Sequence, residues 1–503
     1  MADLLPRLLS FSPQLHATQG VTDEYDKQIR DLIAYLNQSL LNKEPSDPEV
    51  YGLLDALDPS VHSISFLLIF HSQVHVAQST MKETIPQDVR PGGTLWLKAL
   101  QFLEAFDPVQ IRYTGHEWRR LLELVAKAAE AVSKPILAAV PVRDAILRLD
   151  PSGSMFTSNH ILLSRLCLRG KVYAAACPLI DRDICHFPAP SHLAIKRGHQ
   201  QSSSSELQDQ GSLASYITYA SGLTAKITYR DYLQYFLYSS MIYIGLKKWK
   251  RALHFLNLVV SAPSVGTVSM IMVEAYKKWV IVSLLEKGSA ASLPSITAPH
   301  VTKTYRALAR PYDALADAFK SGDLNRLKGE IDIGQSVWHM DNNTGLVLQL
   351  VPALRKFSIL KLGNTFAALT IGDVARRTSP EPSDIKETET FVASLIMSGA
   401  LNATLLHSRN SSDPTMLRFN VDTRNSNTLS EAKISEQLNR EQERLKDLLT
   451  KIDETESRLE LSREYTDNLR RNQRRKEDSV KEGPSLISRG SGDIDEDIMD
   501  DLH

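Results

Sequence analysis

Residues 351 to 476 constrain the fold of this chain most strongly, because helical patterns, a strand pattern and a long helical pattern follow one another there. Two short helices with an apolar face lead into a third. One of them opens at Thr370-Ile-Gly-Asp373, which has the form of a capping box. Its inward face would carry Ile371, Val374 and Ala375. A loop with Pro and Ser at residues 379 to 383 then ends this helix.

The next helix begins near Asp384 and ends at Gly399, a residue type that favours the C′ position. The apolar period then falls to two, which is typical of strands. Apolar residues alternate with polar ones on both sides of a turn at residues 410 to 414: Leu401, Ala403 and Leu405 before it, and Leu417, Phe419 and Val421 after it. Three helices followed by a hairpin predict a winged helix over residues 351 to 421. Behind a helical array, such a module usually docks other proteins.

The hairpin should bury one face and leave a backbone edge unpaired, and unpaired edges are natural docking templates. We expect Arg418 to be an outward position on that edge. Proline there would remove a backbone donor and weaken docking, whereas alanine would keep the donor.

Composition places the 503-residue chain among soluble globular proteins, with 43% hydrophobic and 23% charged residues. The formal net charge of −1 gives no overall attraction to nucleic acid or acidic membranes. The longest apolar run, residues 64 to 70, is too short to span a membrane, and we see no secretory signal. Three cysteines (Cys167, Cys177 and Cys185) indicate reduced thiols. We expect a location in cytoplasm and nucleus.

Before residue 351 the pattern is almost entirely helical. Apolar residues recur at three-four spacing in several segments: Thr94 to Ala105, Gly115 to Ala131, Pro135 to Leu149 and Ser158 to Cys167. Two phrases, Gly170-Lys-Val-Tyr173-Ala-Ala-Ala176 and Gly245-Leu-Lys-Lys-Trp249-Lys-Arg-Ala252, place an aromatic residue three before an alanine, just after a helix-breaking glycine. This is typical of a tetratricopeptide-like solenoid of α-α repeats. The alternative is a series of unrelated helical hairpins.

These patterns divide the chain into six parts. We predict N-terminal helical repeats at 1–186, a flexible polar insertion at 187–212, further repeats at 213–350, the winged helix at 351–421, a C-terminal bundle helix at 430–476 and a disordered acidic tail at 481–503. The predicted fold class is mostly α, with one small β-hairpin.

The search for catalytic chemistry is negative. His71 and His75 share a helical face, but Ser72 stands where a metalloprotease of this spacing needs a glutamate. Cys185 and His186 are adjacent in sequence, so their side chains point in different directions and are not expected to form a catalytic dyad. The chain contains no His-x-His pair, phosphate-binding glycine loop or nucleophile elbow. We expect neither enzymatic activity nor a metal or cofactor.

The helix that would enter DNA is acidic. A winged helix that binds DNA presents a basic third helix to the phosphates. Here the segment from Asp384 to Ser398 carries three acids (Asp384, Glu387 and Glu389) against Lys386. A protein partner is therefore favoured over nucleic acid.

The long helix carries an incomplete heptad seam. One core position runs through Leu438, Leu445, Ile452 and Leu459, and the other has Ile434 and Leu448 with polar interruptions. A helix in a mixed bundle tolerates such defects; the alternative is a solvent-exposed single helix. Together with the hairpin, these residues form the predicted partner interface: Leu401, Leu405, Leu417, Phe419, Ile434, Leu438, Leu445, Leu448, Ile452 and Leu459.

Helical repeats, a winged helix and a C-terminal helix together resemble the PCI-domain family. The phrases that carry the resemblance are Tyr238 to Leu253, Glu274-Ala-Tyr-Lys-Lys278, Asp341-Asn-Asn-Thr-Gly-Leu-Val347 and Thr365 to Ala375. Within that family the chain is most similar to the third-subunit family of the COP (constitutive photomorphogenesis) signalosome, over roughly residues 90 to 460.

The resemblance implies a non-catalytic scaffold subunit. The COP signalosome removes the ubiquitin-like modifier from cullin-RING ubiquitin ligases, and its zinc isopeptidase sits in a different subunit. By family analogy, the winged helix docks other PCI subunits edge to edge, and the C-terminal helix joins a bundle. Other PCI subunits, and indirectly cullin-RING ligases, are the implied partners, with no membrane or nucleic acid. The alternatives are a PCI scaffold of the proteasome lid or of translation initiation factor three, or a nucleic-acid-binding PCI protein.

Overall fold

A computed structural model describes residues 23–41, 54–81, 85–188, 216–264, 267–378, 385–407, 414–419, 431–460, 465–467 and 470–471. The chain divides into two units, Met1–Ser426 and Asn427–His503. Throughout these described residues it is mostly helical, with one small three-stranded sheet, which confirms the predicted fold class. The predicted insertion lies largely outside the described residues, and the tail lies wholly outside them.

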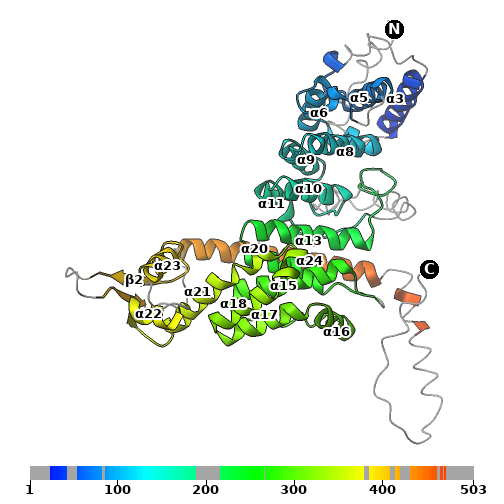
Figure 1. Cartoon of the computed structure of the whole chain (residues 1–503). Helices are drawn as coiled ribbons and strands as arrows, with labels where there is room; N and C mark the ends of the chain where they lie inside the picture. The colour runs from blue at the N-terminus through cyan, green and yellow to red at the C-terminus, as the bar shows by residue number, and fades with distance from the viewer. Residues whose placement is uncertain are drawn as a thin grey trace, which may run out of the picture. The chain divides into compact units, whose positions relative to one another are not determined.

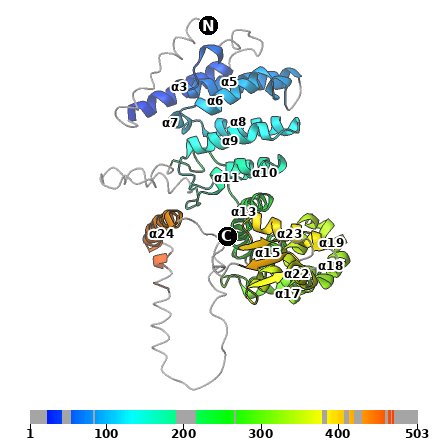
Figure 2. The same cartoon turned by 90° about the vertical axis from the view of Figure 1, so that its left-hand side faces the viewer.

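The first half of unit 1 is a succession of helices, and Figures 1 and 2 show the pairs α8–α9 and α10–α11 stacked in chain order ahead of α13. Several of the segments with three-four apolar spacing are helices to within a few residues. The helices are α3 (Asp23–Leu41), α5 (Ser63–Met81), the 3-10 turn η1 (Gln87–Val89), α6 (Thr94–Ala105), α7 (Pro108–Ile111), α8 (Gly115–Ala131), α9 (Ile136–Leu149), α10 (Ser158–Arg169) and α11 (Tyr173–Ile180).

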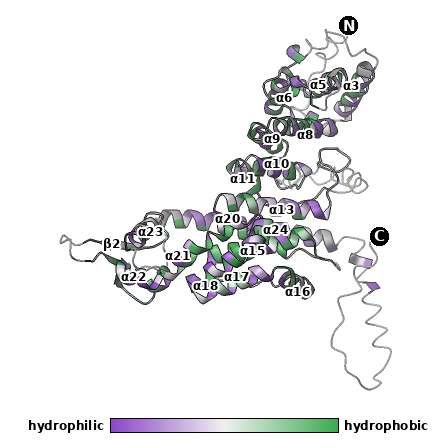
Figure 3. Ribbon diagram, in the orientation of Figure 1, coloured by the Kyte–Doolittle hydropathy of each residue, from purple (hydrophilic) through white to green (hydrophobic). Residues whose placement is uncertain are grey.

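The succession continues after the insertion. Its helices are α13 (Tyr229–Gly245), α14 (Trp249–Val260), α15 (Met270–Lys287), α16 (Pro299–Leu308), α17 (Arg310–Ser321), α18 (Leu324–Ile333), α19 (Gln335–Met340), α20 (Thr344–Val347) and α21 (Leu350–Gly363). Each long helix carries both hydrophobic and hydrophilic residues along its ribbon (Figure 3), as expected when one face is buried.

Four turns between helices share one backbone conformation. Ser133, Lys171, Lys247 and Asn342 all have φ between 53° and 58°, although none of them is glycine. In each turn the next residue donates its N–H to a carbonyl five positions back, as Lys248 does to Tyr243 at 3.0 Å. This is the Schellman pattern that closes a helix. The two helices with the predicted glycines do end at them, but the left-handed residue comes later in the turn: Gly170, the C-cap of α10, has φ −78°, and Gly245 is the last helical residue of α13.

The glycines Gly170 and Gly245 allow helices of neighbouring repeats to pack closely against each other. A Cβ added at Gly245 would lie 2.5 Å from Cε2 of Tyr173, and one at Gly170 would lie 3.4 Å from the backbone nitrogen of Ile136. In both cases the glycine at the end of one hairpin's first helix meets the start of the second helix in the preceding hairpin. The aromatic and glycine positions of the two phrases thus form one stacking contact, which is specific to consecutive repeats.

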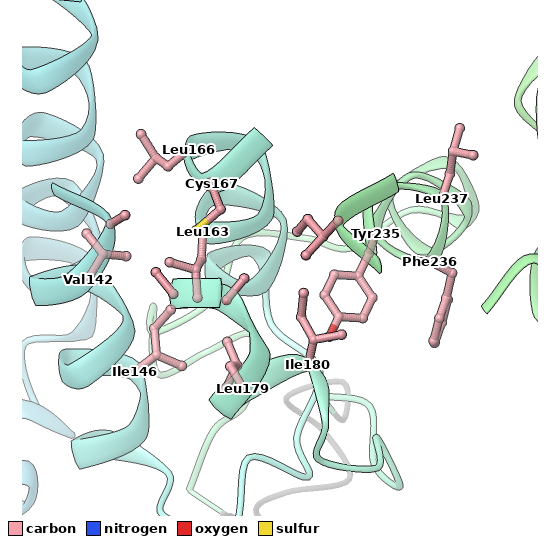
Figure 4. Close-up of a cluster of buried hydrophobic side chains, with 14 of the residues drawn as sticks. Val142, Ile146, Leu163, Leu166, Cys167, Leu179, Ile180, Tyr235, Phe236 and Leu237 are labelled. Atoms are coloured by element: carbon pink, nitrogen blue, oxygen red, sulfur yellow. The ribbon is translucent and has the colours of Figure 1, made fainter. Parts of the chain in front are cut away.

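The repeats share one continuous core. Figure 4 shows Val142 and Ile146 of α9 on one side of Leu163 and Cys167 of α10. On the other side, Ile180 of α11 lies beside Tyr235 of α13. All of these side chains are at most 3% exposed. Burial raises the pKa of the Cys167 thiol to about 12, so this cysteine is protonated and inert. The described cysteines are all free.

A partly buried polar network joins two of the phrases that carried the family resemblance. Lys278 is 6% exposed and donates to Glu274 Oε1 at 2.6 Å and to Asn343 Oδ1 at 3.0 Å. Lys277 donates to Asp341 at 2.7 Å, and Tyr312 donates to the same carboxylate at 2.8 Å. Buried charges are tolerated when paired in this way. The network fixes the turn between α19 and α20 against α15, just ahead of the winged helix.

The winged helix has a core of its own. It contains β1 (Ala368–Thr370), α22 (Ile371–Thr378), α23 (Ile385–Met397), β2 (Ala403–Leu406) and β3 (Met416–Phe419). Its core residues are Ile359, Ile371, Val374, Val392, Leu395, Leu401, Ala403, Leu417 and Phe419. Unit 2 contains the long helix α24 (Glu431–Glu460).

Candidate assembly interface

The sheet of the winged helix has three strands, in the order β1-β3-β2, and both pairings are antiparallel. The sequence predicted only the hairpin of β2 and β3, and missed β1. Arg418 is paired with Ala368 on one side and with Thr404 on the other. The prediction that Arg418 stands on an open edge is therefore wrong, because β3 is the central strand. Val421 lies outside the described residues.

The alternation of backbone hydrogen bonds shows which groups face outward on β2. Phe419 donates to Ala367 at 2.9 Å, and Ile371 donates to Thr415 at 2.9 Å, so odd-numbered residues of β3 face β1. Arg418 and Met416 must then face β2, where Thr404 and Leu406 are their partners. The N–H groups of Ala403 and Leu405 consequently point away from β3, toward the open side of β2.

The apolar side chains predicted from the hairpin mostly face the core of the module. Leu401, Leu417 and Phe419 are 3%, 0% and 4% exposed, and Leu405 is partly buried against the same cluster. What the module presents outward is different: Met397 at the end of α23, Leu406 and Met416 are 89%, 50% and 41% exposed. Leu406 and Met416 face each other across the β2–β3 pair. The period-two pattern does not identify Leu406 and Met416, because both lie at the alternate strand positions that were expected to be polar and to face outward.

Local sequence explains how α22 and α23 are held. One half of the predicted capping box is present: the Asp373 N–H donates to Thr370 Oγ1 at 3.1 Å. The Thr370 hydroxyl also donates to Asp373 Oδ2 at 2.7 Å. Gly399 has φ 71° beyond the end of α23, as predicted. Arg355 of α21 is 8% exposed and donates to Glu387 Oε1 at 3.0 Å and to Thr388 Oγ1 at 2.7 Å. Glu387, one of the acids that made α23 unsuited to DNA, thus pairs with α21, although its side chain is 64% exposed.

The long helix α24 carries an exposed apolar stripe along its described residues. The predicted seam residues Ile434, Leu438, Leu445, Leu448 and Ile452 are between 41% and 64% exposed. The rest of the described helix surface is dominated by Glu, Lys, Arg and Asp. Exposed apolar residues repeated along one helix mark an interaction site. The side chain of Leu459 lies outside what the structure describes.

The residues considered in the sequence as candidate metal ligands do not form a metal site in the structure. His71 Nε2 is 2.7 Å from the carbonyl of Glu117, and burial lowers the pKa of its imidazole. His75 is exposed. Among the described residues, no three His, Cys, Asp or Glu side chains gather as a metal site, and no helix is long and apolar enough to cross a membrane.

Comparison with known proteins points to one family. The family model described as COP9 signalosome complex subunit 3, N-terminal helical repeats, matches residues 26–197 and 211–301. The COP9 signalosome complex subunit 3 of Emericella nidulans is 42% identical over 507 residues, covering 100% of both chains. The proteins of that name from Neurospora crassa and Arabidopsis thaliana are 28% and 25% identical, covering 88% and 70% of this chain and 86% and 71% of their own.

Proposed function

This chain belongs to the COP9 signalosome subunit 3 family, and from that membership we propose that it is a non-catalytic scaffold subunit of a COP9 signalosome. That complex removes the ubiquitin-like modifier from cullin-RING ubiquitin ligases. The proposed direct partners are other PCI subunits, the cullin-RING ligases being reached through the assembled complex. The proposed location is cytoplasm and nucleus, and the proposed bundle helix spans residues 430 to 476.

The observation that carries the proposal is the exposed stripe of α24. Five apolar side chains at heptad positions stand in solvent on a helix that is otherwise charged. Burying a Leu or Ile side chain contributes about 1.5–3 kcal/mol. Leaving five of them exposed is unfavourable unless another surface covers them in the functional state. A bundle of helices from several subunits is the cover that we propose.

The open side of β2 is the second proposed docking element. Its outward N–H groups at Ala403 and Leu405 offer a template to a strand of a neighbouring winged helix. Leu406 and Met416 would add apolar contact beside it.

We further propose that the isolated chain cleaves no cullin modifier and needs no cofactor. The support is the sequence itself, which lacks the His-x-His spacing that a zinc isopeptidase of this type requires. Cleavage by the purified chain at the rate of the whole complex would contradict this.

The double variant Leu445→Asp/Ile452→Asp tests the bundle. Both side chains are exposed in the free chain, at 59% and 56%, so its melting temperature should not change. Association should weaken by more than about a hundredfold, because two apolar contacts are lost and two carboxylates would be buried. Co-elution with the other subunits on size exclusion measures this.

The matched control is Thr450→Asp/Ser457→Asp, which adds the same charge on the opposite face of α24. We expect this control to assemble normally. Equal loss in both variants would mean that charge alone matters, and normal assembly of the seam variant would refute the bundle.

A further inference from the structure

Three turns of the helical array lie in a row along one edge. The turn between α10 and α11 meets the start of α9, since Gly170 approaches Pro135 and Ile136. Arg169 in that turn is 2.8 Å from Glu130 near the end of α8. The end of α13 in turn approaches Tyr173 at the start of α11. Residues at the α8–α9, α10–α11 and α13–α14 turns therefore share one surface.

This surface is basic, and its lysines are free. The turns carry Lys134, Lys171, Lys247, Lys248 and Lys250, all of them exposed, and none forms an ion pair with a described residue. The two carboxylates beside them are already engaged: Glu130 by Arg165 and Arg169, and Asp181 by Arg251. We call these five lysines the turn ridge. It carries uncompensated positive charge in a chain whose formal net charge is −1.

Two ridge lysines occupy an unfavourable backbone conformation. Lys171 and Lys247 have φ of 53° and 56°, where glycine or asparagine is preferred. The Schellman closure accounts for the positive φ itself, as it does at Ser133 and Asn342, but it does not require a lysine at that position. A basic residue near a helix C-terminus is favourable in itself, but a lysine one position earlier or later would supply that charge without the strain.

An apolar step adjoins the basic part. Val132, Ile136, Leu137 and Val140 at the α8–α9 end are 38%, 49%, 42% and 39% exposed. Lys134 stands between Val132 and Ile136 in the turn. A ligand that lies along the three turns would therefore contact apolar side chains at its α8–α9 end and mainly lysines along the rest of its length.

We propose that the turn ridge binds an extended acidic segment of a partner protein, with an apolar residue at one end of the segment. Three neighbouring hairpins at about 10 Å spacing cover about 20 Å, which an extended peptide of about six residues spans. A peptide suits the surface better than nucleic acid does. The exposed apolar side chains offer a phosphate backbone no partner but can pack against an apolar residue of a peptide. The rings of Tyr173 and Trp249 pack against the core instead of offering a stacking surface to bases.

This site goes beyond the proposed scaffold function. It uses α8 to α14, and neither the winged helix nor α24 contributes a residue to it. Its test is therefore independent of subunit assembly and uses the purified full chain.

The probe is a fluorescein-labelled peptide of one leucine followed by about five glutamates, matched to the length of the ridge. Fluorescence anisotropy should show binding that weakens as salt is added. The variant Lys171→Gln/Lys247→Gln/Lys248→Gln should bind at least about tenfold more weakly, since three charge contacts are lost. The matched control Lys303→Gln/Lys320→Gln/Lys328→Gln removes three exposed lysines from α16, α17 and α18 and should bind like the native chain.

A second variant separates binding from stability. Lys171→Gly/Lys247→Gly relieves the unfavourable backbone conformation, so it should resist urea better than the native chain while binding the peptide more weakly. Lower stability would show that the lysines serve only the helix ends, and would overturn the argument. Three other results would also overturn it: no binding by the native chain, equal weakening in the control, or tighter binding of a thymidine oligonucleotide of equal charge.

Discussion

At the scale of single residues, His160 shows how burial sets a pH response. It is 2% exposed at the third position of α10, and its Nδ1 accepts hydrogen bonds from the Thr157 backbone N–H at 3.2 Å and from its hydroxyl at 2.9 Å. The Nε2 atom is buried without a hydrogen-bond partner among the described residues, beside the ring of Tyr235. Burial lowers the pKa of this imidazole from 6.5 to about 4.

We predict that this residue destabilises the chain in acid. The unfolded state takes up a proton near pH 6.5 and the folded state only near pH 4, so stability is full above 6.5 and falls between the two values. At 1.36 kcal/mol per pKa unit the loss is about 3 kcal/mol. Thr157 and His160 form the capping box of α10. His160→Gln keeps it, because glutamine is a usual partner at that position, and should flatten the pH dependence of urea unfolding. The exposed His75→Gln should leave it unchanged; an equal slope in native chain and His160→Gln would contradict the prediction.

Gly245 provides a second prediction at this scale. An alanine methyl would lie 2.5 Å from the ring of Tyr173, which is itself packed against the core. Overpacking of this kind costs about 1–3 kcal/mol, so Gly245→Ala should lower the midpoint of urea unfolding. Gly329→Ala in α18 meets nothing within 4 Å and should instead stabilise by about 0.5–1 kcal/mol. The same sign for both variants would mean that helix propensity outweighs the stacking contact.

How far single residues were predictable depends on the range of the interaction. The helix-start contact between Thr370 and Asp373 was predicted because both partners lie within four residues of one another. The left-handed lysines were missed because Lys171 and Lys247 have no local signature for positive φ; helix stacking imposes it. The sequence phrases singled out Gly245 and Tyr173 but did not show that they contact each other. That contact joins residues far apart in sequence, so no local pattern reveals it.

At the scale of elements, the same argument explains the missed strand. β1 has three residues, too few for alternation to be visible, and it pairs with β3, from which it is separated by α22 and α23. The hairpin of β2 and β3 was predicted because its strands are close in sequence and their inward residues alternate. Which strand lies in the centre follows only from the non-local pairing, and that decides where an edge is available.

Because β2 and not β3 is an edge strand, the proline substitution that tests docking belongs on β2. The Ala403 N–H points away from β3, so Ala403→Pro at the first residue of β2 removes no hydrogen bond of the free sheet. Because the Ala403 side chain is 4% exposed in the core, the added ring atoms should lower the stability of the free chain without unfolding it. The substitution should weaken assembly by up to about tenfold, because one intermolecular hydrogen bond contributes about 1 kcal/mol. Arg418→Pro should destabilise the free chain itself, since its N–H faces Thr404 within the ladder. Circular dichroism and affinity for the neighbouring subunits separate the two effects, with Arg418→Ala as the native-like control; unchanged assembly of Ala403→Pro would exclude this edge as a docking surface.

At the scale of the whole molecule, the buried residues fall into two cores. One runs through the helical array from Tyr25 to Leu354, and the other fills the winged helix from Ile359 to Phe419. The heptad pattern of α24 was legible in the sequence because it repeats along a single helix. Within its own unit the helix leaves the described seam residues between 41% and 64% exposed, a property that sequence periodicity alone does not give.

This separation predicts the outcome of truncation. A chain that ends at Ser426 retains every residue of both cores, so its melting temperature should equal that of the full chain. It should nevertheless fail to join the other subunits, because α24 is gone. A chain that ends at His407 is the destabilised control, since it also loses the central strand β3 with Leu417 and Phe419, which are 0% and 4% exposed. Calorimetry of the three chains decides the matter: if the Ser426 truncation melts several degrees lower, the apolar stripe of α24 is covered by its own chain, and the bundle with other subunits loses its physical basis.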